Sequence, residues 1–240
     1  MREWFDESSM LAMWATACVI VATLLLLARG RLRKKRRDTI LICGPSGAGK
    51  TALFFGMQKP GTLVDTVTSM QENIGQLQWN APKNGACTIA MVDLPGNPSL
   101  RFLLQKYAPQ CKGVVFVVDS VDFLPNVTLA AEHLLDILLL PHIAGPKVPI
   151  LVACNKAERV TAHGVDFLRK RLEKEIEQLK STRISLLEDR TAKQLISGLG
   201  KTDKNFSFTD CRNKVEFAKV SVYKGDIASV QKFVQAVSKR

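Results

Sequence analysis

The 240-residue sequence predicts an α/β domain, in which helices flank a mostly parallel sheet of six strands, behind one N-terminal transmembrane helix. Three observations predict this architecture. From residue 39 onward, short apolar runs alternate with longer segments of helical periodicity, which is the pattern of strands joined by crossover helices. A glycine-rich loop directly follows the first apolar run. An uncharged apolar stretch of helical length precedes that run, at residues 10–28.

The apolar stretch at residues 10–28 has the length of a membrane span. Its nineteen uncharged residues would extend roughly 28 Å as a helix, close to the ~30 Å hydrocarbon core of a bilayer. Acidic residues near the N-terminus argue against a cleaved signal peptide, which begins with basic residues. One basic residue precedes the span and seven follow it. The positive-inside rule therefore places residues 1–9 across the membrane and the remainder of the chain in the cytosol.

The basic linker at residues 29–38 carries seven of the positive charges behind the formal net charge of +12. These residues form one linear cluster beside the apolar stretch, which favours contact with anionic lipid headgroups over a nucleic-acid surface. We therefore expect the lipid bilayer as a partner and no direct nucleic-acid partner. Two glycosylation acceptors, Asn126 and Asn205, should remain unmodified in the cytosol, and a glycan on either would reverse this topology.

The six cysteines do not form a disulfide or zinc framework. They are scattered along the chain, with no Cys-x-x-Cys pair and no histidine cluster. Cys43, Cys87 and Cys154 fall within apolar runs. We therefore expect buried free thiols at these three positions, in a protein of a reducing compartment.

The domain at residues 39–240 alternates between strand-like and helix-like segments. Strands are predicted at residues 39–43, 74–79, 87–92, 113–119, 149–155 and 215–222. The second and third would form a hairpin, and the continuous apolar runs of the fourth and fifth are typical of buried parallel strands. Helices are predicted at residues 51–58, 127–140, 164–180 and 228–237. The stretch 181–214 is long for a connection, and we expect an insertion with one helix near residues 186–196.

The glycine-rich loop matches the phosphate-binding pattern G-x-x-x-x-G-K-[ST] at every position. It comprises Gly44, Pro45, Ser46, Gly47, Ala48, Gly49, Lys50 and Thr51. Glycines allow backbone N–H groups to face phosphate oxygens at the N-terminus of a helix. Lys50 would reach the β- and γ-phosphates of a nucleotide, and the Thr51 hydroxyl would bind Mg²⁺.

A second motif, Asp93-Leu94-Pro95-Gly96, ends a predicted strand. A carboxylate at this place would hold the hydration shell of Mg²⁺ through water. The backbone N–H of Gly96 would face the γ-phosphate. Together with the phosphate-binding loop, the motif indicates a site at the carboxyl ends of parallel strands.

A third motif, Asn155-Lys156-Ala157-Glu158, follows another buried strand. It is close to N-K-x-D, whose carboxylate accepts hydrogen bonds from the N1–H and the 2-amino group of guanine. Adenine does not offer this pair of donors. Here the acid is glutamate, which keeps the charge and reaches one methylene further, and the motif predicts guanine selectivity.

The three motifs in this order resemble the Ras-like small GTPase fold, and the whole chain more closely resembles the family of signal recognition particle receptor beta subunits. The closer resemblance covers the apolar stretch, the basic linker, DLPGNPSLR (93–101), CNKAE (154–158) and GKTDKNFSFTDCRNKVEFAKVSV (200–222). It implies a GTPase of the endoplasmic reticulum membrane, with a short lumenal tail, that uses GTP or GDP and Mg²⁺. In the GTP form it would bind the receptor's alpha subunit in co-translational protein targeting. The ribosome and the translocon are further implied partners.

The resemblance also assigns residues beyond the phosphate-binding loop. Asn155, Lys156 and Glu158 would contact guanine, and Ser221 would lie beside the base. In VDTVTSMQEN (64–73) the second hydroxyl on Mg²⁺ would come from Thr68 or Ser69, and the sequence leaves both open. Met70 and Leu100 are candidates for contact with the alpha subunit.

The residue after Gly96 bears on the rate of hydrolysis. Many small GTPases carry glutamine there, which orients the attacking water. Asn97 is shorter, and Pro98 behind it restricts the loop. Asn97 is therefore the candidate catalytic residue, and we expect slow intrinsic hydrolysis.

Three other functions fit parts of this pattern. A membrane-anchored P-loop ATPase or kinase would need no guanine-reading motif, and competition between GTP and ATP would separate it from a GTPase. A trafficking GTPase of the ADP-ribosylation factor type usually has a lipidated amphipathic N-terminus in place of a span. An anchor whose nucleotide is never hydrolysed would fit the departure at Asn97.

Overall fold

The computed structural model describes residues 14–21, 23, 37–59, 66–81, 85–186, 196, 199 and 205–239. The chain divides into two compact units, residues 1–36 and 37–240. In the first unit, residues 14–21 and 23 are helical and exposed. The rest of the predicted span, the tail before it and most of the basic linker lie outside the described residues. Within the described residues, no helix has both the length and the apolar character needed to cross a membrane.

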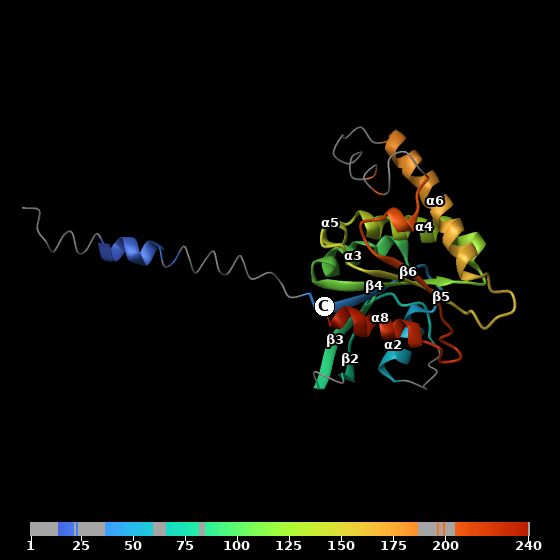
Figure 1. Cartoon of the computed structure of the whole chain (residues 1–240), viewed down its shortest axis with the longest axis horizontal. Helices are drawn as coiled ribbons and strands as arrows, with labels where there is room; N and C mark the ends of the chain where they lie inside the picture. Colours follow the sequence, from blue (N-terminus) through green and yellow to red (C-terminus); the bar gives the residue numbers. More distant parts are fainter. Residues whose placement is uncertain are drawn as a thin grey trace, which may run out of the picture. The chain divides into compact units, whose positions relative to one another are not determined.

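The second unit contains the predicted six-stranded sheet, in the order β2-β3-β1-β4-β5-β6 (Figure 1). The strands are β1 (Thr39–Cys43), β2 (Asn73–Ala81), β3 (Gly85–Asp93), β4 (Cys111–Asp119), β5 (Ile150–Asn155) and β6 (Val215–Lys219). Only the β2–β3 hairpin is antiparallel, and the four other pairings are parallel. The predicted fold class is therefore confirmed for this unit.

Helices cover both faces of the sheet. They are α2 (Lys50–Gln58), α3 (Phe102–Tyr107), α4 (Phe123–Leu139), α5 (Pro141–Ala144), α6 (Val165–Leu186) and α8 (Ala228–Ser238). In Figure 1, α2 and α8 lie on one side of the sheet, and α4 and α6 on the other. The short helices α3 and α5 were not predicted, because six and four residues are too few to show a helical period.

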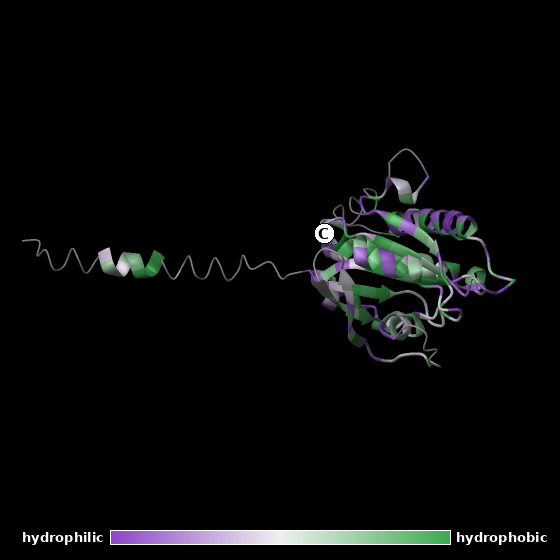
Figure 2. Cartoon of the chain, turned by 60° about the horizontal axis from the view of Figure 1, so that its bottom comes forward, coloured by the Kyte–Doolittle hydropathy of each residue, from purple (hydrophilic) through white to green (hydrophobic). Residues whose placement is uncertain are grey.

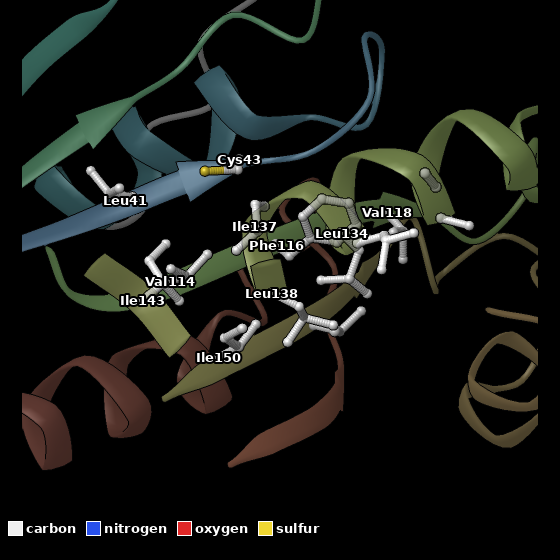
Figure 3. Close-up of a cluster of buried hydrophobic side chains, with 14 of the residues drawn as sticks. Leu41, Cys43, Val114, Phe116, Val118, Leu134, Ile137, Leu138, Ile143 and Ile150 are labelled. Atoms are coloured by element: carbon white, nitrogen blue, oxygen red, sulfur yellow. The ribbon is translucent and has the colours of Figure 1, made fainter. Parts of the chain in front are cut away.

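Two hydrophobic cores result, one on each face. Leu41, Phe116 and Val118 pack with α4 and α6, whereas their sequence neighbours Ile40 and Val117 pack with α2 and α8. Figure 3 shows side chains of β1, β4 and β5 pointing toward Leu134, Ile137 and Leu138 of α4. Because the buried strands face apolar layers on both sides, their sequences are continuously apolar. Cys43 and Cys154 are buried in these strands as predicted, whereas Cys87, near the start of β3, is only half-buried. In Figure 2 the strands are mostly hydrophobic, whereas the helices carry both colours.

The end of the predicted insertion is fixed to the domain by two phenylalanines and three hydrogen-bonding side chains. Phe206 and Phe208 are buried, and their backbone N–H groups donate to Glu177 and Glu173 of α6 at 2.8 and 2.9 Å. Asn213 is also buried and donates to the carbonyls of Ile143 in α5 and of Val148. α6 extends to Leu186, Ile196 is helical, and the remainder of the predicted helix lies outside the described residues.

We predict that His133 on α4 makes the stability of the domain fall at acid pH. Burial, with a smaller effect of the Arg101 charge, lowers the pKa of His133 to about 3, against about 6.5 in an unfolded chain. Since the folded pKa is the lower one, His133 destabilises the fold only as pH falls below about 6.5. The cost is about 1.4 kcal/mol per pH unit until the pH approaches the folded pKa.

Urea unfolding of the wild type and of His133→Leu at several pH values measures this effect. The free energy of unfolding of the variant should fall less steeply between about pH 6 and pH 5 than that of the wild type. His142→Leu, at an exposed position, is the control and should keep the wild-type slope. Equal slopes for all three proteins would contradict the prediction.

Candidate nucleotide-binding site

The carboxyl ends of β1, β3, β4 and β5 bring the three sequence motifs to one edge of the sheet. Ile42 pairs with Asp93, Cys43 with Phe116, and Asp119 with Asn155. The loops that follow these strands therefore leave the sheet at similar heights. This is the edge at which doubly wound α/β folds bind ligands.

The phosphate-binding loop has the backbone that its glycines permit. Gly44, Gly47 and Gly49 have φ values of 136°, 76° and 90°, which side chains other than glycine rarely adopt. A Cβ at Gly44 would lie 2.1 Å from the carbonyl oxygen of Val117. The backbone N–H groups of residues 46–51 donate no hydrogen bond to the described part of the chain. They remain available to an anion at the N-terminus of α2.

Lys50 lies beneath this loop. Its side chain is buried, and its Nζ donates to the carbonyl of Pro45 at 2.8 Å. Burial lowers the pKa of Lys50, and the Asp93 carboxylate opposes this shift. Gly96 approaches so closely that a Cβ there would lie 2.7 Å from Nζ and 2.5 Å from the Ser46 nitrogen. The predicted neighbours of the γ-phosphate are thus brought together.

Asp93 lies at the centre of a buried polar cluster. It is 0% exposed, and its Oδ2 accepts hydrogen bonds from Thr51 Oγ1 at 2.7 Å and from Asn73 Nδ2 at 2.9 Å. Burial raises the pKa of Asp93, and these hydrogen bonds oppose the shift. Its Oδ1 is buried and has no hydrogen-bond partner among the described residues. An oxygen donor of this kind suits the hydration shell of Mg²⁺.

The two candidate hydroxyls of the segment before β2 differ in position. Ser69 Oγ lies 3.0 Å from Thr51 Oγ1 and joins the Asp93 cluster. Thr68 is exposed and, within the described residues, makes no side-chain hydrogen bond, although it lines the same hollow as Lys50 and Gly96. The geometry brings Ser69, and not Thr68, to the Thr51 hydroxyl.

Asn155 ties the phosphate-binding loop to the loop after β6. Its Nδ2 donates to the carbonyl of Ala48 at 2.9 Å, and its Oδ1 accepts from the backbone N–H of Val222 at 3.1 Å. A Cβ on Gly49 would lie 2.3 Å from the same Nδ2. The Asn155 side chain is therefore engaged in holding the two loops together.

Lys156 and Glu158 are each held by a side chain outside their own motif. Lys156 pairs with Asp119 at the end of β4 and has a positive φ of 61°. Glu158 Oε2 accepts from Ser221 Oγ at 2.6 Å. The backbone of Ser221 is itself held by an antiparallel β-bridge to the backbone of Asp226. The predicted base-reading residues thus converge, with Ser221 beside Glu158.

Asn97 has a local partner. Its Oδ1 accepts from the backbone N–H of Ser99 at 3.0 Å and caps the 3₁₀ turn Pro98–Leu100. Among the described residues this is its one side-chain hydrogen bond.

Two residues of the site were missed in the sequence. Asp119 ends a predicted strand at the ligand edge, and this position was a usable signal. Asn73 pairs with Asp93 in the β2–β3 ladder, and the sequence carried no signal for it because the register of the hairpin was not known.

Comparisons with known proteins give the family of the chain. The family model "Signal recognition particle receptor beta subunit" matches residues 35–215. The chain is 30% identical to signal recognition particle receptor subunit beta of Mus musculus, over 93% of this chain and 87% of that protein. The counterpart of Saccharomyces cerevisiae is 29% identical, over 85% and 86%.

Solved structures give the same result. The mammalian SRP receptor structure is 31% identical, with a TM-score of 0.70 over 83% of this chain and 99% of that chain. The SRb-GTP/SRX complex of Chaetomium thermophilum is 22% identical, with a TM-score of 0.63 over 85% and 98%. This second likeness shows the fold alone.

We predict that Asn155→Ala destabilises the protein even without nucleotide. The change removes the partners of the Ala48 carbonyl and the Val222 N–H, which should lower the free energy of unfolding by about 1–3 kcal/mol. Urea unfolding without nucleotide measures it, with exposed Asn126→Ala as the control. An unchanged unfolding midpoint would show that Asn155 does not hold the two loops.

Proposed function

We infer the function of this chain from one premise, that the chain belongs to the signal recognition particle receptor beta subunit family. We propose that it is the membrane-anchored, GTP-binding subunit that holds the receptor's alpha subunit at the endoplasmic reticulum for co-translational protein targeting. The observation that carries the proposal is the convergence of the phosphate-binding loop, Asp93 and residues 155–158 at one edge of the sheet.

The residues present fit a nucleotide with Mg²⁺. The N–H groups of residues 46–51, which have no hydrogen-bond partner among the described residues, and the Lys50 ammonium would bind its phosphates. The hydroxyls of Thr51 and Ser69 would bind the cation, with Asp93 acting through water. Ser69 is favoured over Thr68 by its 3.0 Å contact with Thr51. The cation would neutralise phosphate charge and orient the β- and γ-phosphates.

Guanine selectivity would depend on Glu158. The bond from Ser221 occupies Oε2 of this carboxylate at 2.6 Å and fixes its longer side chain. Lys156, paired with Asp119, would lie against the base. An ATPase without guanine selectivity would have no use for this constellation.

We expect slow intrinsic hydrolysis. The Asn97 side chain caps its own turn, so it does not extend toward an attacking water as a longer glutamine would. GTP would then act mainly as a marker of the binding-competent state. Rapid single-turnover hydrolysis by the purified protein, without a partner, would contradict this.

The alpha subunit would bind to the segment before β2 and to α3, each of which exposes an apolar side chain. Glu72 accepts hydrogen bonds from Lys106 and Tyr107 at 2.7 and 3.0 Å, which brings the segment before β2 alongside α3. Met70 and Phe102, on these two elements, are 68% and 60% exposed. Leu100 packs against the core and is a poorer candidate.

The membrane side of the proposal comes from the sequence. The uncharged stretch at residues 10–28 and the basic residues behind it support a single span with the GTPase domain in the cytosol. The basic linker would hold the domain near anionic headgroups. The bilayer is thus the second proposed partner, and the ribosome and translocon follow only from the family's role.

The first prediction from this proposal concerns the base. Glu158→Gln removes the charged acceptor for the guanine N1–H and 2-amino groups. The affinity for fluorescent GDP should fall about 10- to 100-fold, because hydrogen bonds to charged groups contribute about 1.5–3 kcal/mol. Fluorescent GDP is titrated into the detergent-solubilised full chain in the presence of Mg²⁺ to measure this affinity. ATP should not compete with GDP for the wild type.

Glu216→Gln is the matched control, since Glu216 is exposed on β6 and should leave the GDP affinity unchanged. Equal binding of GDP and ATP by the wild type would replace the GTPase proposal by a general P-loop NTPase. Unchanged GDP binding by Glu158→Gln would remove Glu158 from the base site.

The second prediction concerns the partner. Met70→Glu and Phe102→Glu each place a charge at an exposed apolar position of the proposed interface. Each should weaken binding of the alpha subunit to the GTP-loaded protein by about tenfold or more and leave GTP binding unchanged. Leu129→Glu, at an exposed apolar position of α4, is the control. Equal binding by all variants would place the interface elsewhere.

A further inference from the structure

Asn73 is the one member of the Asp93 cluster to which neither the motifs nor the proposed function assigns a role. It is the first residue of β2 and pairs directly with Asp93, the last residue of β3. Side chains of directly paired residues in an antiparallel hairpin lie on the same face, about 5 Å apart at Cβ. The register of the hairpin therefore places the Asn73 amide next to the Asp93 carboxylate.

The amide touches both sides of the cluster. Its Nδ2 donates to Asp93 Oδ2 at 2.9 Å and lies 3.4 Å from Ser69 Oγ. Thr51 donates to the same Oδ2 at 2.7 Å and lies 3.0 Å from Ser69 Oγ. The four side chains close a ring that joins α2, the segment before β2, the hairpin and the end of β3.

Two donors on one oxygen fix how the carboxylate is turned. With Oδ2 held by Thr51 and Asn73, Oδ1 has a defined direction, and it is the buried oxygen without a partner among the described residues. A Thr51 hydroxyl bound to a cation would use a lone pair and keep its proton for Oδ2, and Asn73 supplies the second, independent donor to the same oxygen. An asparagine suits this role because it donates without adding charge.

We propose that Asn73 is a positioning residue for the divalent cation. It keeps Asp93 oriented toward the cation's hydration shell and thereby slows nucleotide release only while the cation is bound. This inference rests on the proposed binding of a guanine nucleotide with Mg²⁺. Residues that orient groups around a metal typically contribute about 10- to 100-fold to metal affinity.

The test is release of fluorescent GDP from the full chain in detergent micelles, over a range of Mg²⁺ concentrations and in excess EDTA. For Asn73→Ala, the Mg²⁺ concentration that gives half-maximal slowing should rise about tenfold or more. In EDTA the variant and the wild type should release GDP at the same rate. Asn73→Leu, which keeps the approximate size and removes the donor without adding charge, should shift the Mg²⁺ dependence as far.

Gln76→Ala, at an exposed position of the same strand, is the control and should behave as the wild type. An unchanged Mg²⁺ dependence in both Asn73 variants would overturn the positioning role. Release that is faster by the same factor with Mg²⁺ and with EDTA would show a structural role instead, and would also overturn it. If the wild type binds no GDP, or if it releases GDP at a rate that does not depend on Mg²⁺, the result would instead refute the proposed function on which the inference rests.

Discussion

Burial of the Asp93 carboxylate is the constraint on which the site depends. A buried charge is costly unless hydrogen bonds compensate it, and the donors for Asp93 come from α2 and β2. Both donors reach Asp93 only if α2 is packed in place and the β2–β3 hairpin has this register. The Lys50 ammonium adds an opposite charge nearby. The phosphate-binding loop, the cation site and the packing of the β2–β3 hairpin therefore depend on the same hydrogen bonds.

On the side of the site that would hold the base, the neutral side chain of Asn155 connects separate elements as Asp93 does on the phosphate side. Asn155 joins the phosphate-binding loop to the loop after β6, so the place of β6 decides where Ser221 and Glu158 lie. That place is in turn held by Phe206 and Phe208, which pack in the core against α6 and β6. The ligand edge of the sheet therefore depends on Phe206 and Phe208, neither of which is a predicted nucleotide-binding residue.

The strands and most helices could be predicted because the physics that forms them is local or periodic. Strands buried on both faces are continuously apolar, and glycines mark the loop that needs positive φ. The choice between Thr68 and Ser69 could not be predicted, since adjacent hydroxyls differ only in the direction that the backbone gives them. The inward packing of Leu100 and the exposure of Phe102 follow from the 3₁₀ turn at Pro98. This turn is too short to produce a periodic pattern of apolar residues, so neither orientation could be predicted. Asn73 was missed because its role appears only when the hairpin register is known.

The most direct test of the account is whether nucleotide state controls partner binding at a membrane. Vesicles carrying the full chain would be loaded with GDP or with a non-hydrolysable GTP analogue, and binding of the soluble alpha subunit would be measured by flotation. The account predicts that the GTP analogue retains the alpha subunit and that GDP releases it. Equal retention in both states would contradict it, and would leave the chain as an anchor whose nucleotide does not regulate assembly.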